Sequence, residues 1–488
     1  MTDPITPFST ATDMLAALAA KRISVRELWE LHEARIARHN PALNVIVERD
    51  PEATRAAVAS AEERLARGDA ASLTGLPITL KESMNVRGLR TTVGVKIWSK
   101  HRAEEDGAIA ARTRALGAVL LGKTNVAPML SDWQANNPVY GRTNNPWDLG
   151  RTPGGSTGGS AAVAAGLTPL EYGSDIGGSI RVPAVFCGVY GHRPSETALP
   201  RSGQFPGSCL PNAAAVMGVQ GPLARSAEDL ELGFDAVAGA EVGEAVAWRL
   251  SLPAARHTRL ADFRVAVLPH VSWVPLAAEV ADAQERLIER LAAIGCKVSR
   301  VQPPLLGDHR DAFALYLTLV TAMTTADAPP ERRQRRLERL RTRHDDLSRA
   351  QLRALTGSAV DYLEWHASRE RLRAAWRELF CSWDVLICPA FCRLAYPHLE
   401  HPWPPDPAVA TRFDIDGKPA PYDFGMFYPS VATLPGQPAT AFPVELSRDG
   451  LPIGLQAVGP YLEDRTTLRF VALMAREWGG FRRPPDFA

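Results

Sequence analysis

Hydrophobic and polar residues along the first 70 positions follow the period of amphipathic helices. Residues 24–39 carry an apolar face 3–4 residues apart, and Ser24 with Glu27 forms a capping box at its start. Pro41 follows the predicted end of this helix. An alanine-rich helix is predicted over 51–67. These segments form an expected N-terminal helical arm over residues 1–70.

Short apolar strands alternate with helical segments in the rest of the chain. This alternation favours an α/β fold with a mixed or parallel sheet. We find neither an internal repeat nor a convincing linker, so residues 1–488 are expected to form one large domain. The predicted strands are 44–47, 76–80, 119–121, 263–268, 297–301 and 384–388, strand-like segments recur in 436–459, and helices are predicted at 107–116 and 278–293.

A charged, mostly helical insertion is predicted at about 305–380, and it is a candidate cover for one end of the active site. Its segment 331–344 contains seven arginines. Such a run is compatible with a nucleic-acid patch or with a solvated helix face. Acidic residues intersperse it and the whole chain has a net charge of +1, so we favour the solvated face.

Composition narrows the class of protein. Hydrophobic residues make up 45% and charged residues 22% of the chain, as in ordinary globular proteins. The near-neutral charge favours neither nucleic acid nor an anionic membrane as a partner. No apolar run approaches the length of about 18 residues of a membrane span. Asp3 and Asp13 occupy a region where a secretory signal would be basic, so a cytoplasmic protein is expected.

Six cysteines are too few for a disulfide scaffold. Cys388 and Cys392 form a C-x3-C pair, but no second pair or histidine cluster accompanies it. We therefore expect buried free thiols, no metal and no cofactor.

Two glycine-serine segments, Gly154–Ser160 and Gly173–Ser179, lie only 23 residues apart when counted from Ser156 to Ser179. A low-complexity linker is disfavoured, because a helix-forming alanine run and a strand candidate separate the two segments. They are expected to be tight loops at the ends of elements in a folded core.

Two hydrolytic arrangements are compatible with these loops. Gly154–Gly158 matches the G-x-S-x-G elbow, but no downstream histidine stands in a distinctive context. A lysine base is the alternative, because burial disfavours the charged amine. Lys81 directly follows a predicted buried strand, although an isolated lysine at a strand end would usually reach solvent.

The whole set of motifs resembles the amidase signature family, and the resemblance covers nearly the full chain. It is weakest in 196–215 and 305–380. It implies one large domain with a central mixed β-sheet flanked by helices on both faces. The matching segments are Gly75–Lys81, Gly122–Asn125, Asn145–Asp148, Pro153–Ser160, Gly173–Gly191, Gly436–Ala439 and Gly450–Gly459.

The resemblance implies a Ser-cisSer-Lys triad, with Ser179 as nucleophile, Ser156 as bridging serine and Lys81 as base. It also implies a cis peptide bond between Gly155 and Ser156. Other roles are expected at the surrounding positions. The oxyanion hole is assigned to the backbone amides of Ile176, Gly177 and Gly178, together with that of Ser179. Thr157 is expected to support the serine network. Asp175 and Arg181 are expected to hold the loop rigid.

The resemblance implies an enzyme that hydrolyses small hydrophobic or aryl amides, with esters and carbamates (urethanes) as further substrates. The substrate is expected to be a small molecule, and neither nucleic acid nor a membrane is expected as a partner. The protein is expected to be a monomer or a homodimer. One alternative is the glutaminase subunit of a tRNA-dependent amidotransferase, and another is a non-catalytic binding protein on the same fold. The expected substrate-binding residues are Met129, Leu130, Trp133 and Gly155, although Met and Trp in this loop are equally compatible with core packing.

Overall fold

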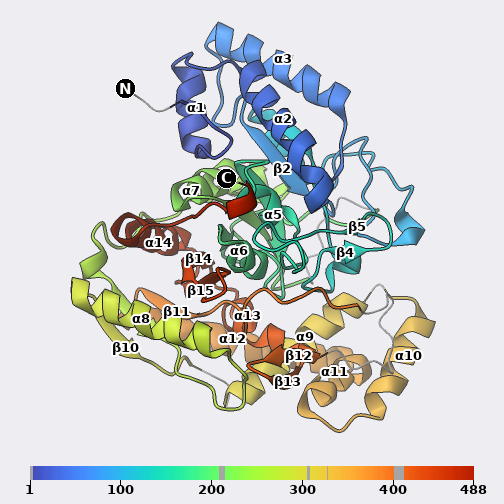
Figure 1. Ribbon diagram of the computed structural model, residues 1–488. Helices are drawn as coiled ribbons and strands as arrows, with labels where there is room; N and C mark the ends of the chain where they lie inside the picture. The colour runs from blue at the N-terminus through green and yellow to red at the C-terminus, as the bar shows by residue number, and fades with distance from the viewer. Residues whose placement is uncertain (1–3, 208–214, 305–307, 327, 401–411, 488) are drawn as a thin grey trace.

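A large mixed β-sheet forms the centre of the protein (Figure 1). The computed structural model describes residues 4–487 apart from 208–214, 305–307, 327 and 401–411. Within that part of the chain, 11 strands join in the order β1-β3-β2-β6-β8-β7-β14-β15-β11-β9-β10. They are β1 (Ile46–Glu48), β2 (Pro77–Lys81), β3 (Val119–Thr124), β6 (Leu170–Asp175), β7 (Tyr190–Arg193), β8 (Val219–Ala224), β9 (Arg264–Val267), β10 (Lys297–Arg300), β11 (Val385–Pro389), β14 (Ala439–Leu446) and β15 (Pro452–Val458).

The sheet is largely parallel toward both ends and antiparallel in the middle. β2 runs parallel to β3 and β6, and β9 runs parallel to β10 and β11. The pairs between β6 and β11 through β8, β7, β14 and β15 are antiparallel, as is the edge pair of β1 with β3. Two small hairpins lie outside this sheet, namely β4 (Asn136–Asn137) with β5 (Gly141–Arg142), and β12 (Arg412–Ile415) with β13 (Lys418–Pro421).

Helices cover both faces of the sheet, as strand β6 demonstrates. Leu170 and Tyr172 contact Gly233 of α7 (Ala227–Val237). Glu171, between them in sequence, contacts Gly159 of α5 (Gly159–Ala164). Because neighbouring residues of a strand point to opposite faces, α5 and α7 lie on opposite sides of β6. The predicted α/β sheet with helices on both faces is confirmed.

The remaining helices surround this core. They are α1 (Ala11–Ala19), α2 (Val25–Leu43), α3 (Pro51–Arg67), α4 (Ala108–Ala115), α6 (Arg181–Cys187), α8 (Ala278–Ile294), α9 (His309–Thr325), α10 (Pro330–Arg341), α11 (Asp346–Thr356), α12 (Ala359–Ser382), α13 (Phe427–Thr433) and α14 (Asp464–Trp478). The N-terminal helices lie at one end of the molecule, and α10 and α11 lie at the other (Figure 1).

The first long helix has the predicted start but a later end. Ser24 and Glu27 form both hydrogen bonds of the capping box of α2. The expectation that the helix ends before Pro41 is wrong, because α2 continues through Pro41 to Leu43. Its last turn is closed by Asn44, which is left-handed at φ 49° and donates its amide to Asn40. A favourable left-handed cap thus fixes the end of the helix beyond the proline.

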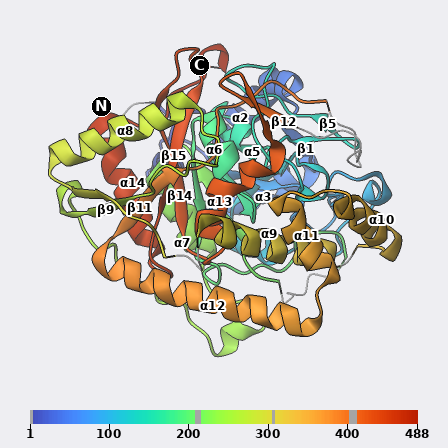
Figure 2. The ribbon, with the colours of Figure 1, turned by 90° about the horizontal axis from the view of Figure 1, so that it is seen from below.

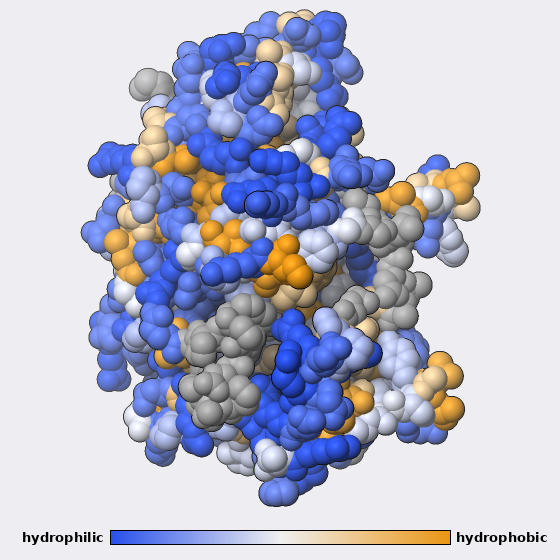
Figure 3. Space-filling model, turned by 90° about the vertical axis from the view of Figure 1, so that its right-hand side faces the viewer, coloured by the Kyte–Doolittle hydropathy of each residue, from blue (hydrophilic) through white to orange (hydrophobic). Residues whose placement is uncertain are grey.

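The arginine-rich segment forms α10 and the residues that follow it. Most of its arginines are exposed, while Arg336 and Arg339 are partly buried. Figure 3 shows the face on which α10 lies, and this face is largely hydrophilic with hydrophobic patches. The structure therefore shows this segment as a largely exposed helix. Figure 2 shows the long helix α12 crossing another side of the molecule, with α9 near α13.

The cysteines are mostly inside the protein. Cys187, Cys296, Cys388 and Cys392 are buried free thiols, as expected, whereas Cys381 is exposed on α12. Cys209 lies outside the described residues. Of the helices in the described part of the chain, none has the length and apolar character that crossing a membrane requires.

Candidate active site

Lys81 lies at the end of β2, inside the protein with no exposed surface. Its Nζ donates to Ser156 Oγ at 2.8 Å, to Ser174 Oγ at 3.0 Å and to the Ser174 carbonyl at 3.4 Å. Burial lowers the pKa of Lys81 to about 7, although the charges of Asp175 and Glu171 act to raise it. At neutral pH a substantial share of this lysine is therefore an uncharged amine, which can accept a proton.

Ser156 lies in the loop that leads into α5, and the peptide bond between Gly155 and Ser156 is cis, as expected. Gly155 is packed directly against the segment 132–134. A Cβ atom at Gly155 would lie 2.5 Å from the carbonyl oxygen of Asp132, so only glycine fits. The loop that carries Ser156 is thus fixed against the segment that contains Trp133.

Ser179 lies in the loop between β6 and α6, and its exposed fraction is 6%. Among the described residues, no hydrogen bond joins its hydroxyl to Ser156 or to any other group. The structure therefore brings Lys81 and Ser156 together, with Ser179 on the neighbouring loop. The loop with Ser156 leads into α5, and the loop with Ser179 connects β6 to α6. Helix α5 contacts both β6 and α6.

The backbone amides before Ser179 divide into two groups. The Gly178 amide donates to Asp175 Oδ1 at 3.1 Å, so it is already engaged and does not match the free donor that was expected. The amides of Ile176, Gly177 and Ser179 have no acceptor within the described part of the chain. Three unpaired donors in one tight loop can bind a negatively charged oxygen.

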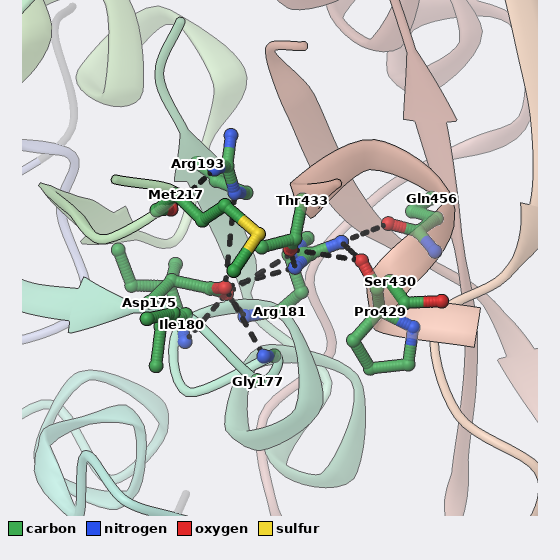
Figure 4. Close-up of polar contacts among 12 residues, drawn as sticks. Asp175, Gly177, Ile180, Arg181, Arg193, Met217, Pro429, Ser430, Thr433 and Gln456 are labelled. Carbon is green, nitrogen blue, oxygen red and sulfur yellow. Dashed lines mark hydrogen bonds and ion pairs between the residues drawn. The ribbon is translucent and has the colours of Figure 1, made fainter. Parts of the chain in front are cut away.

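Asp175 and Arg181 form the buried centre of this loop (Figure 4). Arg181 Nη2 lies 2.8 Å from Asp175 Oδ1, and neither side chain is exposed. The same guanidinium donates to Thr433 Oγ1 and to Gln456 Oε1. Burial opposes ionisation of Asp175, but the charges of Arg181 and Arg193 hold its pKa at about 2. This network ties the nucleophile loop to α13 and β15.

Glu171 is a second buried carboxyl group beside the lysine. It lies on β6 opposite Thr79 of β2, two residues before Lys81. One carboxyl oxygen accepts from Thr124 Oγ1 at 2.6 Å, while Oε2 has no partner among the described residues. Burial raises the pKa of Glu171 to about 7, and Thr124 and Lys81 act to lower it.

The residues expected to bind substrate lie in different surroundings. Met129 is 36% exposed, and Met129 and Leu130 both have left-handed backbones, at φ 51° and 57°. Trp133 is buried at 5% exposure, and its Nε1 donates to the Gly177 carbonyl at 3.0 Å. Only Met129 thus offers a large apolar surface to solvent, while Trp133 and Gly155 are packed inside.

Thr157 was expected to support the serine network. Its side chain is buried above Gly173, where a Cβ atom would lie 3.0 Å from Thr157 Oγ1. Thr157 Oγ1 has no hydrogen-bond partner in the described residues, so the structure does not join it to Ser156 or Ser179.

Aromatic residues flank the nucleophile loop on two sides. On one side Trp133 contacts Phe391, Phe413 and Tyr422. On the other side Tyr316 of α9 donates its hydroxyl to the Ile176 carbonyl at 2.9 Å and stacks on Phe313. Phe313 in turn contacts Phe427 of α13. The loop is therefore bordered by ring surfaces from distant parts of the chain.

Sequence reasoning missed Ser174, Glu171 and the loop contact of Tyr316. Ser174 stands directly before Asp175 in the glycine-serine motif, so a hydroxyl group next to the triad was visible in the sequence. Glu171 was a charged residue inside an otherwise apolar strand candidate, which is a recognisable signal. Tyr316 could be named from the sequence only as one unranked apolar candidate in 308–380, because its contact spans 140 positions.

No group of three or more His, Cys, Asp or Glu side chains in the described residues is arranged to hold a metal ion.

Residues 27–468 match the Amidase family. A glutamyl-tRNA(Gln) amidotransferase chain of Coxiella burnetii (strain RSA 493 / Nine Mile phase I), the A component of that enzyme, is 30% identical, over 98% of this chain and 99% of that protein. The corresponding chain of Acidothermus cellulolyticus is also 30% identical, over 95% of this chain and 93% of its own length.

Solved structures match the whole fold. A 6-aminohexanoate cyclic dimer hydrolase complexed with substrate has a TM-score of 0.78 at 26% identity, covering 99% of this chain and 100% of that one. A bacterial aryl acylamidase has a TM-score of 0.81 at 22% identity, covering 97% and 96%, and this likeness concerns the fold alone.

Proposed function

The chain belongs to the Amidase family and is an amide-bond hydrolase, and on that premise we propose that it cleaves small hydrophobic or aryl amides through an acyl-enzyme on Ser179. The observation that carries the proposal is the buried Lys81, which has a pKa of about 7 and a hydrogen bond to Ser156. A buried amine of this pKa is an effective general base near neutral pH.

In the proposed reaction, Ser179 Oγ attacks the substrate carbonyl while its proton passes to Ser156. Ser156 at the same time gives its own proton to the neutral amine of Lys81. The carbonyl oxygen, now an anion, accepts hydrogen bonds from the free amides of Ile176 and Gly177 and from that of Ser179. The proton then returns from Lys81 through Ser156 to the leaving amine. Water hydrolyses the acyl-enzyme by the same route.

The rings beside the loop are mostly buried, and they make its surroundings apolar, which supports a hydrophobic acyl or aryl group in the substrate. Trp133 and Tyr422 border one side, and Tyr316 with Phe313 borders the other. Amides, anilides, esters and carbamates pass through similar tetrahedral intermediates, so ester and urethane cleavage belong to the same proposal.

A panel of anilides, primary amides, esters and carbamates tests the proposal on the purified chain. We expect anilide hydrolysis to fall by at least about 10³-fold in Lys81→Ala, since the base is lost. Full amide hydrolysis by Lys81→Ala would show that Lys81 is not the base. A fluorophosphonate probe should label the wild type and leave Ser179→Ala unlabelled; equal labelling of the two would rule out Ser179 as the nucleophile.

The glutaminase subunit of an amidotransferase is the second candidate. It is favoured by the full-length similarity to two glutamyl-tRNA(Gln) amidotransferase chains. A glutaminase of this kind would hydrolyse glutamine only when partner subunits are present. Anilide hydrolysis by the isolated chain, without glutaminase activity, would support the first candidate, whereas the reverse result after adding partner subunits would support the second.

A further inference from the structure

Two side chains from outside the nucleophile loop donate to two consecutive carbonyl groups within it. Tyr316 of α9 donates its hydroxyl to the Ile176 carbonyl at 2.9 Å. Trp133, from the segment before β4, donates Nε1 to the Gly177 carbonyl at 3.0 Å. The two donors come from segments more than 180 positions apart in the sequence, and they fix adjacent peptide groups.

Peptide geometry makes each of these bonds control an amide as well as a carbonyl. In a planar trans peptide, the C=O and the following N–H point in opposite directions. The bond from Tyr316 to Ile176 therefore sets the direction of the Gly177 amide. The bond from Trp133 to Gly177 sets the Gly178 amide, which donates to Asp175 at 3.1 Å on the other side.

The two peptide groups therefore differ in how many hydrogen bonds hold them. The peptide between Gly177 and Gly178 is held at both ends, by Trp133 and by Asp175. The peptide between Ile176 and Gly177 is held only through its carbonyl, and its amide has no acceptor among the described residues. The glycine that follows would let an unheld peptide rotate readily. Tyr316 is thus the contact that fixes a free donor beside Ser179.

Both donors are themselves held in place. Tyr316 has no exposed surface, and its ring stacks on Phe313 at an interplanar angle of 10°. Trp133 packs against Phe391 and Tyr422 with ring centroids 5.2 and 5.0 Å away. Burial raises the pKa of Tyr316, so its hydroxyl keeps the proton that it donates.

We propose that Tyr316 and Trp133 are positioning residues that preset the oxyanion-binding amide of Gly177. Tyr316 acts directly through the Ile176–Gly177 peptide, and Trp133 acts by fixing the next peptide, Gly177–Gly178, whose own amide is held by Asp175. This inference rests on the proposed function of Ser179. Tyr316 lies on helix α9, within the segment 305–380 where the resemblance to the amidase signature family is weakest. The helical insertion thereby takes part in catalysis without touching the reacting atoms.

Tyr316→Phe tests the proposal, because it keeps the ring and removes only the donor. Loss of a whole oxyanion donor lowers kcat by about 10²–10³-fold, and a loosened donor should cost less. We expect kcat for an anilide to fall about 10–100-fold, with KM within about twofold of wild type. Binding of a trifluoromethyl ketone, which places an anionic oxygen in the hole, should weaken by about the same factor. Binding of a non-reactive substrate analogue should stay unchanged.

Tyr172→Phe is the matched control. Tyr172 is a buried tyrosine whose hydroxyl also donates to a backbone carbonyl. This carbonyl is that of Gly233, at 2.8 Å, on the face of β6 that α7 covers. Its loss should lower thermal stability while leaving kcat within about twofold of wild type. Trp133→Phe is a second, independent variant and should lower kcat and trifluoromethyl ketone affinity together.

Three outcomes would overturn the proposal. Tyr316→Phe could keep the kcat and the ketone affinity of wild type. It could weaken the ketone and the non-reactive analogue equally, which would indicate a general loss of structure. If Tyr316→Phe does not fold, Trp133→Phe replaces it, and unchanged kcat and ketone affinity in Trp133→Phe would overturn the proposal. A wild-type chain that folds but does not hydrolyse or label would instead refute the proposed function itself.

Discussion

The pH dependence of hydrolysis tests most directly what burial does to Lys81. In water a lysine amine has a pKa of about 10.5, whereas burial brings the pKa of Lys81 to about 7. Only the neutral amine can take the proton of Ser156. The activity of the enzyme below pH 7 should therefore follow the fraction of Lys81 that is uncharged.

The size of the effect follows from these two values. With a pKa of 10.5, only about one lysine in 3,000 would be neutral at pH 7, whereas a pKa of about 7 makes about half of them neutral. We expect kcat/KM to rise about tenfold for each pH unit below 7 and to level off above it. The rate of labelling by a fluorophosphonate should show the same rise with pH below 7 (the acid limb of the profile), because labelling needs the base but no leaving amine.

Glu171→Gln provides the perturbation. Near pH 7 Glu171 is partly ionised, and its negative charge helps to raise the pKa of Lys81, so the variant should lower that pKa and move the acid limb modestly to lower pH. Asp175, which also acts on Lys81, stays ionised beside Arg181 and is unchanged in the variant. Asp229→Asn is a control, because Asp229 is a buried carboxyl group that bonds the start of α1 instead.

The assay is kcat/KM for an anilide from pH 5 to 9, together with the labelling rate, for the wild type and both variants. A wild-type profile that is flat between pH 5 and 8, or that begins to rise only above pH 9, would refute the reasoning about burial. An unchanged limb in Glu171→Gln would show that this carboxyl group carries no charge that Lys81 senses.

Three further predictions concern stability and packing. Because the pKa of Lys81 is lower in the folded than in the unfolded chain, folded protein binds fewer protons between pH 7 and 10.5, so its free energy of unfolding should rise across that window by up to about 5 kcal/mol. Lys81→Met should lack this rise in denaturant titrations, and a parallel slope in the two proteins would contradict it. Gly159→Ala places a Cβ atom 2.3 Å from the carboxyl carbon of Glu171 and should lower the free energy of unfolding by about 1–3 kcal/mol; an unchanged Tm would show that Glu171 can move aside. Arg181→Met leaves Asp175 buried without its main partner and should lower the free energy of unfolding by about 3–5 kcal/mol at pH 7, as measured in denaturant titrations. The decrease should be smaller at low pH. A decrease below about 1 kcal/mol at pH 7 would mean that water reaches the site.

Local elements could be predicted well where local chemistry decides them. Helix α3 spans Pro51–Arg67, as expected for 51–67, because Asp50 caps its start and a left-handed Gly68 its end. The end of α2 was misplaced, because Pro41 is a common stop signal but the left-handed Asn44 provided a better cap three residues later.

By itself, the sequence determined the fold class and the two glycine-serine loops, and its resemblance to the amidase signature family implied the residues proposed to act in them. These depend on hydrophobic period, turn residues and short motifs, all of which are local along the chain. Only the tertiary structure decided the surroundings that give these residues their chemistry. The bond from Lys81 to Ser156 spans 75 positions, and that from Tyr316 to Ile176 spans 140. The pKa of a lysine and the direction of an amide depend on burial and on neighbours brought together by packing, and neither is a property of the local sequence.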